Sequence, residues 1–162
     1  MRTGRRATWV VLTCCFVSLL LAVAPLPDWF DWLRPSFPLL VVIYWSVALP
    51  QRYGTWTGWT LGLCMDVLRD VPMGTHALAF AVVAFAASQL TARMKVFPLM
   101  QQVMAVALLV GVGFVLVRIA GNLTGATTAA LLPALVPVLT TAAVWPWAMA
   151  VQDRLRRAFN VN

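Results

Sequence analysis

The chain has 162 residues, of which 62% are hydrophobic and only 10% charged, with a net charge of +7 and a pI of about 10.7. Soluble domains carry about 25% charged residues, and no polar stretch of this chain is long enough to form a separate soluble domain. The composition excludes a soluble enzyme and indicates a single integral membrane domain over residues 1–162. Short basic loops facing anionic lipid head groups explain the high pI without nucleic acid as a partner.

Six apolar stretches are candidate membrane crossings, since a crossing helix needs roughly 20 mainly apolar residues. In chain order they cover residues 7–24, 36–49, 53–68, 74–91, 98–120 and 128–151. The second and third are short, so we expect them to tilt little or to thin the bilayer locally. The sequence therefore predicts an all-α, polytopic protein with six transmembrane helices.

The first stretch also resembles a signal peptide, because it starts with arginines and ends in Ala22-Val23-Ala24, a triplet of the kind that signal peptidase cuts. Its apolar run is longer than the usual core of about 7 to 15 residues. Pro25 follows the triplet and makes a poor scissile bond. We expect the stretch to be retained, with cleavage as the alternative.

Basic residues predict the orientation, because they gather at the cytoplasmic ends of membrane helices. With the N-terminus in the cytoplasm, nine of the twelve basic residues lie on that side, and the exceptions are Arg34, Arg69 and Arg118. Four of the five acidic residues are then external. Six crossings return the C-terminus to the cytoplasm, so the expected location is a cytoplasmic membrane with both termini inside.

The third stretch carries a ridge of small residues that ends in an acid. Gly54, Gly58, Gly62 and Asp66 follow at four-residue spacing and trace one slowly winding line on a helix. Missing side chains let another helix approach closely in a membrane. Two occupants remain open, a helix of a different protein or the chain's own helix at 74–91, whose small residues are Ala77, Ala81, Ala84 and Ser88.

An enzymatic interpretation is possible for Asp66, Asp70 and His76, since ionisable groups inside a membrane are usually functional. The two acids lie on consecutive turns of one helix, and no second histidine, serine motif or zinc spacing accompanies them. We expect no catalytic residues, no metal ligands and no cofactor, and the three cysteines have no metal-ligand spacing. Pairing of Asp66 with Arg69 or Arg118 is the favoured alternative.

Short motifs occur along the whole chain. They are, in order, Arg34-Pro35, Tyr44-Trp45, Ala48-Leu49-Pro50 with Arg52, Thr57-Gly58, Gly62-Leu63 with Asp66, Met73-Gly74, Ala77-Leu78-Ala79, Gln101-Gln102 and Trp145-Pro146-Trp147 before a basic tail. In this order and spacing they resemble the family of the rod-shape-determining membrane protein MreD, in the versions found in Gram-negative bacteria.

The resemblance implies a non-enzymatic role in the inner membrane. Members of this family belong to the cell-elongation machinery, bind the single-span protein MreC, and through it meet MreB, RodA and a class B penicillin-binding protein. The family fold is also considered similar to the substrate-binding S-components of energy-coupling-factor transporters. The residues carried over as structural or family-motif positions are Arg34, Pro35, Pro50, Gly58, Gly62, Asp66, Gly74 and Arg118.

The leading hypothesis is a scaffold that binds MreC and supports rod shape and lateral peptidoglycan synthesis, with membrane lipids around it and a homo-oligomer left open. The candidate seat for the MreC helix is the glycine ridge together with the surface near Trp45. Residues 25–34 and 69–74 are expected to touch the partner outside the membrane. The alternative is a small-molecule-binding component of an uptake transporter, although the sequence offers few polar groups at mid-membrane depth.

Overall fold

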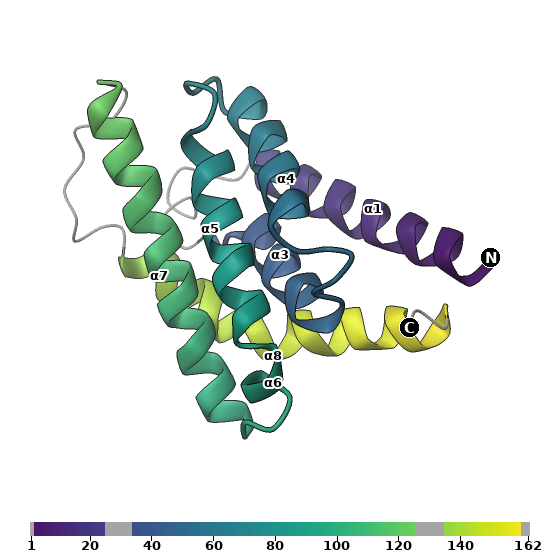
Figure 1. Cartoon of the computed structure of the whole chain (residues 1–162). Helices are drawn as coiled ribbons and strands as arrows, with labels where there is room; N and C mark the ends of the chain where they lie inside the picture. Colours follow the sequence, from purple (N-terminus) through teal and green to yellow (C-terminus); the bar gives the residue numbers. More distant parts are fainter. Residues whose placement is uncertain (1, 25–33, 126–134, 160–162) are drawn as a thin grey trace.

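The computed structural model describes residues 2–24, 34–125 and 135–159, and all regular secondary structure in these residues is helical (Figure 1). The helices are α1 (Arg2–Val23), α3 (Phe37–Ala48), α4 (Thr55–Leu68), α5 (Thr75–Gln89), α6 (Thr91–Met94), α7 (Leu99–Leu123) and α8 (Leu135–Ala158). The prediction of an all-α chain is confirmed for these residues. The start of the sixth predicted stretch, residues 128–134, lies outside the described part.

Each long helix corresponds to one predicted stretch, and α6 is a short turn beyond the fourth. Among the described helices, α7 alone is long and apolar enough to cross a bilayer, with 25 residues and a mean hydropathy of 2.5. The apolar part of α1, Thr8–Val23, and the helices α3 and α5 are shorter than the roughly 20 residues that a crossing needs. The six crossings and the cytoplasmic termini therefore stay predictions.

Helix α3 forms the centre of the fold. All residues from Pro38 to Ser46 are buried. Helix α3 is apolar on every side, and a helix of this kind is stable when other helices surround it. Helix α1 packs on α3, α5 packs on α3, α4 and α7, and α8 packs on α3 and α7. Trp45 is only 1% exposed, so it belongs to this core.

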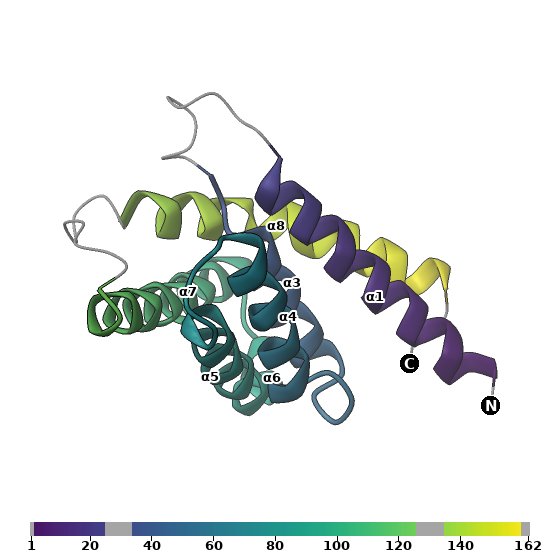
Figure 2. The same ribbon diagram turned by 90° about the horizontal axis from the view of Figure 1, so that it is seen from above.

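The two terminal helices have a different direction from the others. Figures 1 and 2 show α4, α5 and α7 running alongside one another, whereas α1 and α8 lie across them. The start of α1 and the end of α8 extend together beyond the other helices. Helix α1 makes its main contact with α3 and only a small one with α8.

Candidate functional site

The glycine ridge is filled by a helix of the same chain. A Cβ atom added to Gly58 would lie 2.5 Å from the carbonyl oxygen of Phe80 and 2.8 Å from Cβ of Ala84. At Gly62 it would lie 2.4 Å from Cα of Ala77. No side chain fits at these distances, so α4 and α5 touch through their backbones.

This contact corrects the hypothesis that the ridge seats MreC. Gly58, Gly62 and Asp66 are buried under α5, and Trp45 is buried in the core around α3, so none of them offers a surface to another helix. Gly54 precedes α4 and lies beside the loop instead, where an added Cβ would be 3.1 Å from the carbonyl oxygen of Pro50. Of the two open occupants, the chain's own helix is the one that the structure shows.

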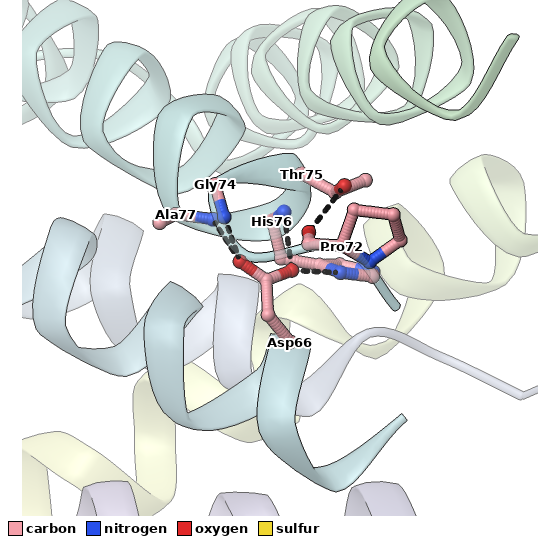
Figure 3. A network of polar contacts seen from close by, with 6 residues as sticks. All are labelled: Asp66, Pro72, Gly74, Thr75, His76 and Ala77. Carbon is pink, nitrogen blue, oxygen red and sulfur yellow. Dashed lines mark hydrogen bonds and ion pairs between the residues drawn. The ribbon is translucent and has the colours of Figure 1, made fainter. Parts of the chain in front are cut away.

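Asp66 ends the ridge by binding the start of α5 (Figure 3). Its Oδ2 accepts hydrogen bonds from the backbone N–H groups of Gly74 at 2.8 Å and Ala77 at 3.3 Å. Its Oδ1 accepts from the backbone N–H of His76 at 2.7 Å and lies 2.8 Å from the ring Nδ1 of the same residue. The first N–H groups of a helix have no partner inside the helix, and its N-terminus favours negative charge. Asp66 therefore caps α5 from α4.

The prediction that Asp66 pairs with Arg69 or Arg118 is wrong, because the helix N-terminus and His76 are the partners that the structure gives its carboxylate. Sequence reasoning missed this role because a cap normally comes from the residue just before the helix. That residue is Gly74, which has no side chain and adopts a left-handed φ of +103°. The family-motif position Gly74 is thus explained by backbone conformation.

The Asp66–His76 pair has the distance of a catalytic acid and histidine, but its surroundings favour a structural role. Asp66 is 0% exposed, and the nearby hydroxyl of Thr75 donates its hydrogen bond to the carbonyl oxygen of Pro72 at 2.7 Å. Among the residues that the structure describes, no group of three or more His, Cys, Asp or Glu side chains could hold a metal ion. The pair holds the α4–α5 turn together.

A cavity of about 270 Å³ lies beside this turn, at the end of the bundle where α4 ends and α5 begins. Its lining includes Arg34, Arg69, Arg118 and His76, and we call it the arginine cavity. Arg34 is held there because its Nη2 donates to the last carbonyl groups of α1, at 2.7 Å from Leu21 O and 2.8 Å from Ala24 O. The sequence predicted that these arginines share one side of the membrane, but not that they share one cavity.

Between α1 and α8 runs an apolar groove, which we call the α1–α8 groove. It consists of two adjoining hollows of about 360 and 670 Å³ that share Thr13, Cys14 and Leu155. Helix α3 contributes Phe37, Leu40 and Val41 to the first hollow. Each of its two hollows has a larger volume than the arginine cavity, and none of the predicted site residues lines the groove.

The C-terminal half of α8 is also fixed to α3 by a polar contact. The hydroxyl of Tyr44 donates to Oδ1 of Asp153 at 2.5 Å. Both side chains line a cavity of about 210 Å³ that also includes Lys95 and Arg156. Tyr44 belongs to a motif that the sequence singled out, whereas Asp153 gave no signal because its partner is more than 100 residues away.

Comparison with known proteins agrees with the family resemblance found in the sequence. The profile of the family described as rod shape-determining protein MreD matches residues 3–152. A rod shape-determining protein MreD from Haemophilus influenzae is 25% identical over 163 residues, which cover all of both chains. No solved structure matches, so the similarity to transporter S-components stays a prediction.

Proposed function

Because the chain belongs to the MreD family of rod shape-determining proteins, we propose that it is a scaffold of the cell-elongation machinery in the inner membrane. Its direct partner is the single transmembrane helix of MreC, and MreB, RodA and a class B penicillin-binding protein are reached through that complex. The proteins of this family act in determining rod shape, and a scaffold needs a surface for another helix rather than a reaction centre. The protein performs no chemistry in this proposal.

The observation that carries the proposal is the α1–α8 groove. The predicted seat on the glycine ridge is closed by α5, which leaves the partner helix to bind elsewhere. Along α1 the groove extends from Trp9 to Leu21, a length of about 18 Å at 1.5 Å per residue. An apolar helix laid along this groove would cover the side chains of Val17 and Val151, which are 46% and 56% exposed.

The predicted orientation of the chain defines which of its segments meet the partner outside the membrane. It leaves the N-terminus of α1 in the cytoplasm. The external segment at residues 69–74, which follows α4, remains a proposed contact with the partner outside the membrane. The other expected external segment includes residues 25–33, which lie outside the described part of the chain.

Site-specific photo-crosslinking tests the groove. A benzophenone amino acid replaces Val17 or Val151 in the groove, and the matched control carries it at Leu108 on α7, which is 68% exposed but lies away from the groove. We expect MreC adducts from the two groove positions and lipid adducts from Leu108. Equal MreC adducts from all three positions, or MreC adducts from Leu108 alone, would contradict the groove as the seat.

Depletion in the native organism tests the scaffold role separately. We expect rods to become round and MreC to lose its localisation when the protein is removed. Unchanged cell shape would contradict the role itself, whereas round cells with no crosslink in the groove would contradict only the position of the seat. The variant Gly58→Leu cannot serve as a test of binding, because its side chain would collide with the backbone of α5.

A further inference from the structure

Gln152 is a polar side chain buried in the wall of an apolar groove. It lies on α8, lines the first hollow of the α1–α8 groove and is only 5% exposed. Leu155, which both hollows share, follows three residues later and lies on the same face of α8. Gln152 therefore lies near the junction of the two hollows, where a helix laid along the groove passes it.

The amide of Gln152 has an unused hydrogen-bonding atom. Its Oε1 is buried and accepts no hydrogen bond from the residues that the structure describes. The two hydroxyl groups of the same hollow are satisfied, because Thr13 donates to the carbonyl oxygen of Trp9 and Ser18 to that of Cys15, both at 2.8 Å. A buried amide oxygen without a donor lowers the stability of the chain on its own. A donor from another molecule would remove this cost.

We propose that Gln152 is the hydrogen-bonding anchor for the transmembrane helix that occupies the α1–α8 groove. This inference rests on the proposed function, which places the MreC helix there. The occupant carries a Ser, Thr, Asn or Gln side chain at the level of Gln152, since such side chains form hydrogen bonds between membrane helices. Glutamine offers an acceptor and two donors, and its last torsion rotates easily, so either end of the amide can turn toward the groove.

The groove and its amide favour a helix over a lipid chain. Along α1 the groove is about 18 Å long, which corresponds to about 12 residues of a partner helix. An acyl chain can fill an apolar hollow, but it offers no donor to Gln152. Apolar packing alone leaves a helix free to slide, whereas one polar contact between helices fixes their register. Gln152 therefore determines how the partner helix is placed along the groove.

The variant Gln152→Met separates this role from a structural one. Methionine is similarly long and flexible but lacks the amide. We expect the protein alone to unfold at the same or a higher temperature, because a buried polar atom without a partner is removed. Binding of full-length MreC, measured with both proteins in lipid nanodiscs, should become about 3- to 20-fold weaker, which corresponds to one hydrogen bond between membrane helices.

The matched control is Gln102→Met on α7, a glutamine that does not line the groove. Nε2 of Gln102 donates to the carbonyl oxygens of Met94 at 3.1 Å and Phe97 at 3.0 Å. We expect a lower unfolding temperature and an unchanged affinity for MreC. If Gln152→Met behaves like this control, Gln152 has a structural role and the proposal is overturned.

A double-mutant cycle identifies the side chain on the partner. Each Ser, Thr, Asn and Gln of the MreC transmembrane helix is changed to Ala and measured against the natural protein and against Gln152→Met. We expect one of these changes to weaken binding to the natural protein and to have no further effect on the variant. Additive effects at every position, or a partner helix without any such side chain, would overturn the anchor.

Crosslinking from a benzophenone amino acid at Val17 shows what occupies the groove in the same samples. MreC adducts together with an unchanged affinity of Gln152→Met would overturn the anchor and leave the proposed function intact. Adducts with lipid alone, or with a second copy of this chain, would overturn both the anchor and the groove as the seat of MreC. A natural protein that binds no MreC at all would contradict the proposed function itself.

Discussion

Gly62 of α4 and Ala77 of α5 are in backbone contact, since an added Cβ on Gly62 would lie 2.4 Å from Cα and 2.6 Å from the backbone nitrogen of Ala77. Four residues later, Asp66 binds the N–H group of the same Ala77. The two helices are therefore held together by close backbone packing at Gly62 and by hydrogen bonds to the carboxylate of Asp66. Both features lie on the predicted ridge, and both hold the chain together.

Gly62→Ala should loosen the α4–α5 contact. The added methyl group meets backbone atoms that cannot move independently, so we expect a loss of about 1–3 kcal/mol or more in the free energy of unfolding. Gly111→Ala is the matched control, because its Cβ would meet only Cγ1 of Val138 at 4.0 Å. Thermal unfolding in detergent compares the two variants, and equal stability would contradict the close packing.

Asp66→Asn should destabilise the start of α5. The amide keeps the size of the carboxylate but replaces one acceptor with a donor that faces N–H groups, so we expect a loss of at least about 2 kcal/mol. Asp70→Asn is the control, since Asp70 is exposed and has a φ of +51°, a conformation that asparagine tolerates. Hydrogen exchange of the first turn of α5 should increase in the first variant and stay unchanged in the second.

Gly74→Ala tests backbone conformation alone. No atom lies within 4 Å of the added Cβ, but the left-handed φ of +103° is unfavourable for a residue with a side chain. We expect a cost of about 1–2 kcal/mol, measured by thermal unfolding. Gly74→Asn should cost less than Gly74→Ala, and the reverse order would contradict the assignment.

Tyr44→Phe removes the hydrogen bond that joins α3 to α8. Asp153 loses its donor in a half-buried place, so we expect a loss of about 1–2 kcal/mol in the free energy of unfolding. Tyr53→Phe is the control, because its hydroxyl makes a longer, exposed hydrogen bond of 3.1 Å to Thr8. If Tyr53→Phe lowers the free energy of unfolding as much as Tyr44→Phe, the hydrogen bond between α3 and α8 stabilises the fold no more than the exposed one does.

The amino-acid sequence by itself determined the all-α class of the described residues, the positions of their helices and the family of the protein. Helix positions follow from local runs of apolar residues, so each of the six predicted stretches corresponds to one helix, even where the helices α3 and α4 are short. The ridge could also be found from sequence, because small residues at four-residue spacing always share a helix face. Its occupant could not.

Only the tertiary structure decided which surfaces are covered. The same ridge fits any closely approaching helix, and the turn at Gly74 brings α5 back onto it. Likewise, Arg34, Arg69 and Arg118 are separated along the chain, and their meeting in one cavity depends on how the helices pack. Contacts between distant segments depend on the directions of the helices, and side-chain periodicity within one helix carries no information about them.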